Sequence, residues 1–217
     1  MTPRLLVINP NTTTGVTDTL HRHIQAALAD VDVQAITARI GAPYISSEVT
    51  YAVAGHAVID AWTDFQSRNS APPDAVLVGC FGDPGLFALR ECCAARVTGL
   101  AEAAFLEAAK KGRFAVVTGG QAWGPMLKRF ARMIDLGDAL LGVHTVAPTG
   151  AQLAAEPAMA IELLTQACRD VAARWPCDAI ILGGATLAGL AATIQPDVDV
   201  PLIDSVMAGA RHAMATH

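Results

Sequence analysis

Strand-like and helix-like segments alternate along the whole chain, and one strand-and-turn unit occurs twice. The run Asp74-Ala-Val-Leu-Val-Gly79 returns as Asp178-Ala-Ile-Ile-Leu-Gly183, at an offset of 104 residues (178 minus 74). Each run is short, apolar and rich in β-branched residues, and each ends at a glycine. Such runs are typical of buried parallel strands. Because strands alternate with helices, we predict an α/β fold, with a mainly parallel sheet and helices on both faces.

The repeat extends beyond this unit and divides the chain into two similar halves. The same offset relates the predicted strand near residues 97–99 to the one near residues 201–203. In open α/β sheets, ligands bind beyond the carboxyl ends of the strands. We therefore predict a ligand cleft where the strand ends of the two halves converge. The predicted subdomains are residues 1–97 with 205–217, and residues 98–204.

Cys80 directly follows the first copy of the repeated unit, at the start of a turn rich in glycine and proline. We expect Asp83 to cap the helix that follows and Pro84 to occupy its first position. A helix N-terminus lowers the pKa of a nearby thiol, so we predict a reactive thiolate at Cys80. Packing is the alternative interpretation, because cysteine is among the residues most often buried. Under the offset of the repeat, Cys80 corresponds to Gly184.

Composition and charge limit the classes of protein to which this chain could belong. Apolar residues make up 53% of the chain and charged residues 16%, as in a globular protein with a large core. The net charge of -5 argues against a nucleic acid partner. No apolar run of the sequence approaches the roughly 20 residues that cross a bilayer, and the N-terminus reads as a strand, not as a signal peptide. We therefore expect a cytoplasmic protein that acts on a small molecule, without a membrane or nucleic acid partner.

The cysteines and histidines of the sequence do not form a metal motif. The five cysteines are odd in number and include no C-x-x-C pair, so we predict neither disulfides nor a zinc site. None of the six histidines follows a predicted strand at its carboxyl end, and we predict no metal. The apolar composition and the helices rich in small residues predict a buried subunit interface, and hence a homo-oligomer.

Four motifs follow one another over nearly the whole chain. They are Ile8-Asn-Pro-Asn-Thr12, Gly41-Ala-Pro-Tyr-Ile45, Cys80-Phe-Gly-Asp-Pro-Gly-Leu86 with Arg90-Glu91, and Asp178-Ala-Ile-Ile-Leu-Gly183. Together they resemble the hydantoin racemase branch of the aspartate/glutamate racemase superfamily. The resemblance implies a cofactor-independent enzyme of two pseudo-symmetric, Rossmann-like α/β subdomains, with the active-site cleft between them. It also implies thiol acid–base chemistry: one cysteine thiolate removes the proton from a carbon next to a carbonyl, and a second thiol protonates the opposite face.

The residues that follow the strands are candidates for such a site, with Cys80 as the predicted catalytic residue. The resemblance implies that Asn9 and Asn11 contact a substrate carboxylate or amide, although asparagine also forms turns and caps helices. Tyr44 lies in a Gly/Pro loop, where it could close over the cleft or simply pack. The glycines after Thr118 expose backbone N–H groups to an anion or form a tight turn, and no nucleotide-binding motif is present in the sequence. The predicted substrate-binding residues are Asn9, Asn11, Tyr44, Phe81, Gly82, Thr118, Gly119, Gly120, Gly184 and Ala185.

The chain departs from the family at the second cysteine. Where the family reads Leu-Gly-Cys-Ala-Gly-Met, this sequence reads Leu182-Gly-Gly-Ala-Thr-Leu187, with Gly184 in the place of the thiol. Cys177 lies at the opposite end of the same predicted strand, roughly 23 Å away. Thr186 is near in sequence, but its hydroxyl is a poor acid or base without activation.

The missing thiol leaves three functions open, which we rank in this order. The first is a racemase or isomerase acting on an amino acid, hydantoin or related derivative, with Cys80 and either water or an unidentified group as proton carriers. The second is a one-thiol decarboxylase or lyase of the arylmalonate type, in which loss of CO2 forms the carbanion and Cys80 alone protonates it. The third is a binding or regulatory homologue that keeps the cleft without the chemistry.

Overall fold

The first half of the molecule alternates strands and helices, in a computed structural model that describes residues 2–69 and 71–215. Its elements are β1 (Arg4–Asn9), α1 (Thr14–Ala27), β2 (Asp32–Thr37), α2 (Glu48–Arg68), β3 (Ala75–Val78), α3 (Leu86–Cys92) and β4 (Arg96–Gly99). β1 and β3 are buried along almost their whole length. This burial accounts for their continuous apolar sequences, because a central parallel strand has helices on both faces.

The second half repeats this alternation with additional short helices. Its elements are α4 (Leu100–Ala109), β5 (Phe114–Gly119), α5 (Trp123–Met133), β6 (Leu140–Val146), α6 (Gly150–Ala155), α7 (Pro157–Arg174), β7 (Ala179–Gly183), η1 (Ala185–Leu187), α8 (Leu190–Ile194), η2 (Gln195–Asp197), β8 (Leu202–Asp204) and α9 (Ser205–Met214). The sequence pattern does not predict α6 or α8, because helices this short have too few turns to show an apolar periodicity.

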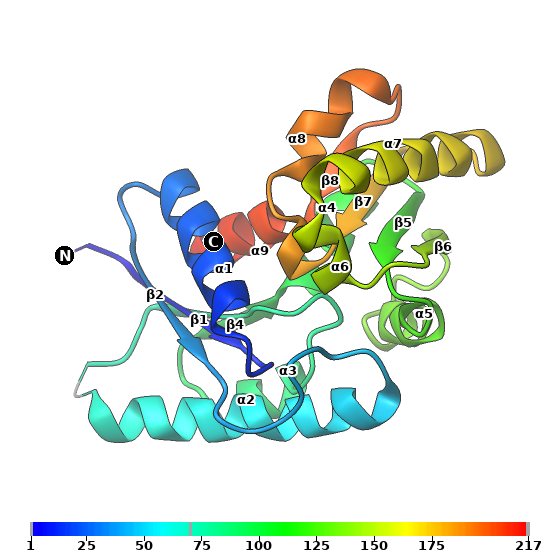
Figure 1. Ribbon diagram of the computed structural model, residues 1–217. Coiled ribbons are helices and arrows are strands. Elements are labelled where there is room, and N and C mark those ends of the chain that lie inside the picture. Colours follow the sequence, from blue (N-terminus) through cyan, green and yellow to red (C-terminus); the bar gives the residue numbers. More distant parts are fainter. Residues whose placement is uncertain (1, 70, 216–217) are drawn as a thin grey trace.

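The two halves have the same sheet topology. The strand order is β2-β1-β3-β4 in one sheet and β6-β5-β7-β8 in the other, and all neighbouring strands run parallel. Figure 1 shows α2 on one side of the first sheet, with α1 and α9 on the other side. The predicted α/β fold of two similar halves with parallel sheets is therefore confirmed.

The aspartates at the start of the repeated unit have the same role in both halves. The Oδ2 atom of Asp74 accepts the backbone N–H of Arg4 at 2.7 Å, and Oδ2 of Asp178 accepts the backbone N–H of Arg113 at 2.7 Å. Each carboxylate thus joins the start of one central strand to the start of its neighbour. The repeated aspartate in the sequence therefore corresponds to one hydrogen bond between neighbouring central strands in each sheet.

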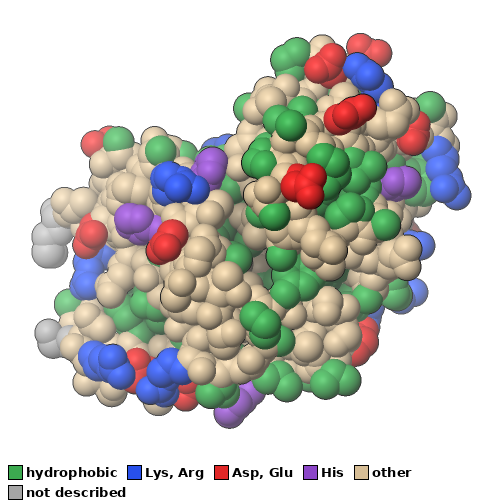
Figure 2. Space-filling view, viewed as in Figure 1, with side chains coloured by type: hydrophobic (Ala, Val, Ile, Leu, Met, Phe, Trp, Pro, Cys, Tyr) green, Lys and Arg blue, Asp and Glu red, His purple; other side chains and the backbone are tan. Residues whose placement is uncertain are grey.

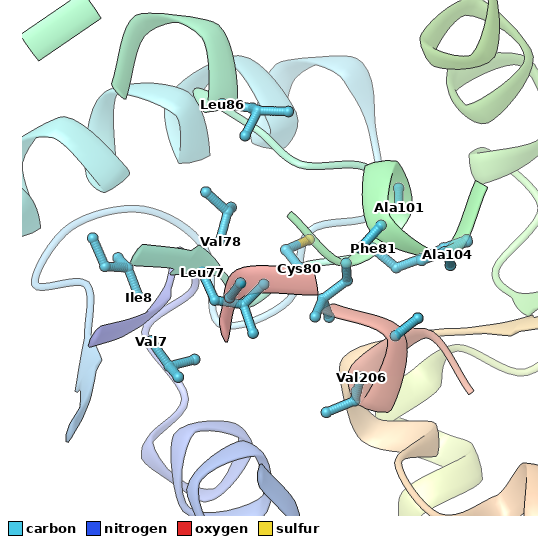
Figure 3. Packing of buried hydrophobic residues seen from close by; sticks show 14 of the residues in the cluster. Val7, Ile8, Leu77, Val78, Cys80, Phe81, Leu86, Ala101, Ala104 and Val206 are labelled. Atoms are coloured by element: carbon cyan, nitrogen blue, oxygen red, sulfur yellow. The ribbon is translucent and has the colours of Figure 1, made fainter. Parts of the chain in front are cut away.

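Aromatic packing joins the two halves beside Cys80. The larger of the two buried apolar clusters contains residues from both sheets. Within it, the ring centroid of Phe105 in α4 lies 5.2 Å from that of Phe114 in β5 and 6.0 Å from that of Phe81. Figure 3 shows Cys80 and Phe81 as neighbours in this packing. The turn after β3 is therefore anchored in the core and is not a free surface loop.

The predicted border between the subdomains, at residues 97 and 98, falls inside β4, which pairs with β3 in the first sheet. The C-terminal helix α9 packs against α1, α4, β3 and β4, so the chain returns to the first half (Figure 1). Residues 1, 70, 216 and 217 of the predicted first subdomain lie outside the described residues. The division into subdomains stays a prediction. In the described part of the chain, no helix has both the length and the apolar character that spanning a membrane requires.

Candidate active site

A cavity lies between the two halves, beyond the carboxyl ends of β3, β5 and β7. It contains about 510 Å³ of empty space, including space open to solvent. This is where open α/β sheets bind their ligands. The residues that line it are Asn11, Val16, Tyr44, Ile45, Gly79, Cys80, Phe81, Thr118, Gly119, Trp123, Gly150, Gly183, Gly184, Ala185, Thr186 and Leu187.

The lining of the cavity is largely apolar and carries no Asp, Glu, Lys, Arg or His among the described residues. Figure 2 shows a largely uncharged middle between the two lobes, with charged side chains mainly toward the edges of the visible face. In the described chain, no group of three or more His, Cys, Asp or Glu could hold a metal ion. Burying a charge without a partner is costly, so a neutral ligand with hydrogen-bonding groups suits this cavity better than a charged one.

The turn after β3 brings Cys80 to the cavity wall. Gly79 begins this turn, and a Cβ atom there would lie 2.7 Å from a leucine side chain of α1 and 3.2 Å from the carbonyl oxygen of Ile8, so a larger residue would displace its neighbours. The backbone N–H of Asp83 donates to the carbonyl of Cys80 at 3.0 Å. From α2, the hydroxyl of Tyr51 donates to the carbonyl of Gly82 at 2.8 Å. The position of the thiol therefore depends on hydrogen bonds within the turn and on a side chain outside it.

The prediction that Asp83 caps the helix after Cys80 is wrong. α3 begins at Leu86, its N-cap is Gly85 with a φ angle of 78°, and the proline before this glycine lies in the turn. The carboxylate of Asp83 instead accepts the backbone N–H groups of Ala101 at 2.9 Å and Glu102 at 2.7 Å, and so caps α4. The N-cap residue of α4 is a glycine, on which a Cβ atom would lie 2.1 Å from Cγ of Asp83. Tertiary packing therefore decides which helix Asp83 caps.

The thiol of Cys80 is not activated as predicted. The residue is only 8% exposed. Burial raises the pKa of the thiol above its ordinary value, and the nearby Asp83 carboxyl raises it further. The predicted lowering of this pKa is wrong, because the turn buries the thiol and because Asp83 takes up N–H groups at the start of α4. A buried thiol with a raised pKa is a neutral proton donor near pH 7.

Tyr44 extends from the first half to the second. It lies in the loop between β2 and α2, and its Oη atom accepts the backbone N–H of Gly150 at 2.9 Å, at the start of α6. Burial raises the pKa of Tyr44, while the hydrogen bond from Gly150 opposes the rise. The phenol is therefore held, in its neutral form, against the half that lacks a thiol.

The second half has a backbone suited to glycine at the position that corresponds to Cys80. Gly184 has a φ angle of 149°, in a region that residues with a side chain rarely adopt. A Cβ atom there would also lie 3.2 Å from Cγ of Leu187. At the neighbouring Gly183, a Cβ atom would lie 2.1 Å from Cε1 of Phe81. The ring of Phe81 therefore packs directly on Gly183 in the second half.

Most of the predicted site residues lie together in the cavity lining. These are Asn11, Tyr44, Cys80, Phe81, Thr118, Gly119, Gly184 and Ala185. The hydroxyl of Thr118 donates to the carbonyl of Gly183 at 2.7 Å, so this side chain connects β5 to β7.

The other predicted site residues, Asn9, Gly82 and Gly120, lie outside the lining and support it from behind. Asn9 is fully buried, and its Nδ2 donates to Oδ1 of Asn11 at 3.0 Å. Gly82 packs against Trp123, since a Cβ atom there would lie 2.4 Å from the indole ring. The N–H of Gly120 donates to the carbonyl of the last residue of β6 at 3.0 Å.

Sequence reasoning did not select several residues of the lining, namely Val16, Ile45, Gly79, Trp123, Gly150, Gly183, Thr186 and Leu187. One signal points to Gly150. The predicted strands at residues 5–8 and 114–117 are related by an offset of 109 (114 minus 5), and this offset places Gly41 on Gly150. Trp123 gives no such signal, because it reaches the cavity only through the packing of α5 against the first half.

Comparison with known proteins agrees with this architecture. The family model described as Asp/Glu/Hydantoin racemase matches residues 5–213. A hydantoin racemase of Pseudomonas sp. (strain NS671) is 30% identical over 212 residues, which cover 97% of this chain and 84% of that protein.

Two solved structures are similar along the same length. An allantoin racemase from Klebsiella pneumoniae has a TM-score of 0.90 and 27% identity, covering 97% of this chain and 86% of that one. An allantoin racemase from Pseudomonas fluorescens has a TM-score of 0.91 and 25% identity, covering 97% of this chain and 88% of that one. With its two matching sheets and the cleft between them, the chain belongs to the Asp/Glu/Hydantoin racemase family.

Proposed function

We propose that this protein racemises a hydantoin-type ring at the carbon between the ring carbonyl and a ring nitrogen, with Cys80 as a proton carrier. The observation that carries the proposal is the uncharged cavity between the halves, with the Cys80 thiol in its wall. The names of the similar proteins, hydantoin racemase and allantoin racemase, support the same substrate class.

The charge of the lining separates the candidate substrates. A free amino acid would bring a carboxylate and an ammonium group into a lining without charged side chains among the described residues. Each such charge costs several kcal/mol to bury without a partner. A hydantoin ring is neutral and presents N–H and C=O groups, which Asn11, Tyr44 and Thr186 can match. The cavity therefore favours the cyclic derivative over the free amino acid.

The raised pKa of Cys80 defines its part in the reaction. Near pH 7 the thiol is neutral and ready to donate its proton to one face of the planar enolate, which forms one enantiomer. To remove the α-proton of the substrate, the thiol must first lose its own proton, which burial and Asp83 disfavour. Proton transfer by a positioned group typically contributes 10²- to 10⁴-fold to a rate, so the thiol remains the main source of catalysis in this proposal.

The same raised pKa favours a second function, decarboxylation of an arylmalonate. In that reaction the loss of CO2 supplies the electron pair, and a neutral thiol has only to donate a proton. The uncharged lining argues against it, because a malonate brings two carboxylates. We therefore place decarboxylation second.

Hydrogen–deuterium exchange in D2O tests the two functions together. We would incubate the protein with each enantiomer of 5-isobutylhydantoin, with allantoin, with leucine and with phenylmalonate, and measure deuteration by NMR and optical purity by chiral chromatography. We expect deuteration with inversion for the hydantoins. The inversion should be lost in Cys80→Ser and kept in Cys92→Ser, which removes an exposed cysteine. CO2 release from phenylmalonate without exchange of the hydantoins would favour the decarboxylase, and the absence of both reactions would overturn both proposals.

A further inference from the structure

The proposed racemisation needs a second proton carrier, and the inference below rests on that proposed function. A racemase delivers a proton to the face opposite the one from which it removed a proton. Cys80 serves one face of the cavity, and the corresponding position in the second half is Gly184, which lines the cavity with a hydrogen atom alone. The second proton must therefore come from another group at the wall of the second half or from water.

Tyr44 brings a hydroxyl group to that wall. Although it belongs to the first half, its Oη atom accepts the backbone N–H of Gly150, in the second half, at 2.9 Å. Cβ atoms placed on Gly150 and Gly120 would lie 3.4 Å and 3.6 Å from this oxygen. Small residues thus surround Oη on the protein side, and both Tyr44 and Cys80 line the one cavity.

The hydrogen bonds of Tyr44 determine what its oxygen can do. A phenol has one O–H donor and two acceptor positions. The N–H of Gly150 occupies one acceptor position, which leaves the O–H proton for another acceptor. The same donor would stabilise the phenolate that remains after the proton has left. Tyr44 can therefore give up a proton without leaving an unpartnered charge.

Cys80 and Tyr44 also influence each other through their charges. A negative charge on Cys80 raises the pKa of Tyr44, so the two groups disfavour simultaneous ionisation. A pair in which one member is protonated and the other is ionised is the state that a two-carrier racemase requires in each direction. Thr186 also brings a hydroxyl close to Gly150, where a Cβ atom would lie 2.7 Å from its Oγ1. An aliphatic hydroxyl is a much weaker acid than a phenol, whose ordinary pKa is about 10.

We propose that Tyr44 is the second proton carrier and acts on the face of the substrate opposite Cys80. In one direction the Cys80 thiol first loses its proton to water, and the resulting thiolate takes the α-proton: the C–H bond breaks, an S–H bond forms and the electron pair moves onto the carbonyl as an enolate. The Tyr44 hydroxyl then protonates the carbon from the other side and becomes a phenolate. The proton that the thiol gave to water then returns to this phenolate and restores the starting state. The other enantiomer uses the same groups in reverse.

The test separates proton removal from inversion in Tyr44→Phe, which keeps the ring. Each enantiomer of 5-isobutylhydantoin is incubated in D2O, and deuteration and inversion are followed separately. We expect the rate of inversion in Tyr44→Phe to fall by at least about 100-fold. The enantiomer whose α-proton faces Cys80 should still exchange that proton for deuterium with retention of configuration. Cys80→Ser should leave exchange only in the opposite enantiomer. Thr186→Val, the matched hydroxyl variant, should keep inversion within a few-fold of the wild type.

The possible failures are distinguishable. If Tyr44→Phe inverts the substrate at the wild-type rate, or only raises KM with kcat unchanged, the assignment of Tyr44 is overturned and the proposed racemase stands. If Thr186→Val loses inversion and Tyr44→Phe does not, Thr186 takes the role instead. If the wild type neither exchanges nor inverts any hydantoin, the proposed function fails and the inference fails with it. Thermal unfolding of each variant establishes that it is folded under the assay conditions.

Discussion

The carboxylate of Asp83 accepts the backbone N–H of Glu102 at 2.7 Å, which ties the turn after Cys80 to the first turn of α4. The side chain of Glu102 in turn accepts the hydroxyl of Thr98 at 2.9 Å and pairs with Arg90. Two buried carboxyl groups therefore lie behind the thiol, and both are partnered by donors from other elements. The protonation of Asp83 is coupled to the stability of the fold and to the chemistry of Cys80.

Stability should fall as pH rises through the range in which Asp83 titrates. Burial raises the pKa of Asp83 from 3.8 to about 7, and the charge of Glu102 contributes to the rise. Between these two pH values the folded protein keeps a proton that the unfolded chain has lost, so the free energy of unfolding decreases with increasing pH. Urea denaturation from about pH 4 to about pH 8 should show a decrease on the order of a few kcal/mol, smaller in Asp83→Asn.

Glu102→Gln serves as the control for this prediction. Removing the Glu102 charge removes one of the causes that raise the pKa of Asp83, so the fall in stability should move to lower pH. An unchanged pH profile in Asp83→Asn would assign the titration to another group and contradict the prediction.

Thiol labelling should report the burial of Cys80. Cys92 is exposed and Cys80 is buried, and burial together with Asp83 raises the pKa of the Cys80 thiol. Because the thiolate is the reactive form, iodoacetamide at about pH 8 should label Cys92 at least about tenfold faster than Cys80. Peptide mass spectrometry of the native protein at a series of times measures both rates.

Asp83→Asn tests the electrostatic part of that prediction. Removing the carboxylate should lower the pKa of Cys80 and move the pH profile of its labelling to lower pH, while the profile of Cys92 stays in place. Faster labelling of Cys80 at every pH, without a shift of the profile, would show that the variant only opens the structure.

The fold followed from the sequence because its signals are local. The runs that begin at Asp74 and Asp178 are short, apolar and repeated, and each aspartate makes the same hydrogen bond to a neighbouring strand. The position of Cys80 at the cavity also follows from local pattern, because a residue after a parallel strand lies at the ligand edge of the sheet.

The electrostatics of the site could not be read in the same way. Asp83 stands three residues after Cys80 and looks like the cap of the next helix, yet it caps α4 across the fold. The sign of the Cys80 pKa shift depends on this tertiary contact and on burial, and neither is visible in a motif. Trp123 likewise meets Tyr51 and Gly82 only because α5 packs against the first half.

Restoring the second cysteine should not restore a second proton carrier. Gly184 has a φ angle of 149°, and a Cβ atom there would lie 3.2 Å from Cγ of Leu187. Holding a residue with a side chain in this conformation costs about 1 to 3 kcal/mol. Gly184→Cys and Gly184→Ala should therefore lose similar amounts of unfolding free energy in urea denaturation, and the cysteine variant should racemise no faster than the wild type. A faster and equally stable Gly184→Cys would mean that the backbone relaxes at this position.

Tyr51→Phe should loosen the turn that carries Cys80. The Tyr51 hydroxyl donates to the carbonyl of the buried Gly82 at 2.8 Å, and its ring packs edge-on against Trp123 with the centroids 6.3 Å apart. Phenylalanine keeps the ring contact but leaves the carbonyl without this donor, which costs about 1 to 3 kcal/mol. We expect a lower free energy of unfolding. In the proposed hydantoin racemisation, we expect the fold decrease in kcat to exceed the fold change in KM.

Thr63→Val is the matched control on the same helix. The Thr63 hydroxyl donates to the carbonyl of Ile59 at 2.9 Å on the exposed face of α2. Its removal also deletes one bond from a hydroxyl to a backbone carbonyl, but far from the turn. If the two variants had equal effects on kcat, the Tyr51 bond would be an ordinary contribution to stability. A larger loss of kcat in Tyr51→Phe would instead mean that α2 sets the position of the thiol through Gly82, because the ring packing is the same with and without the hydroxyl.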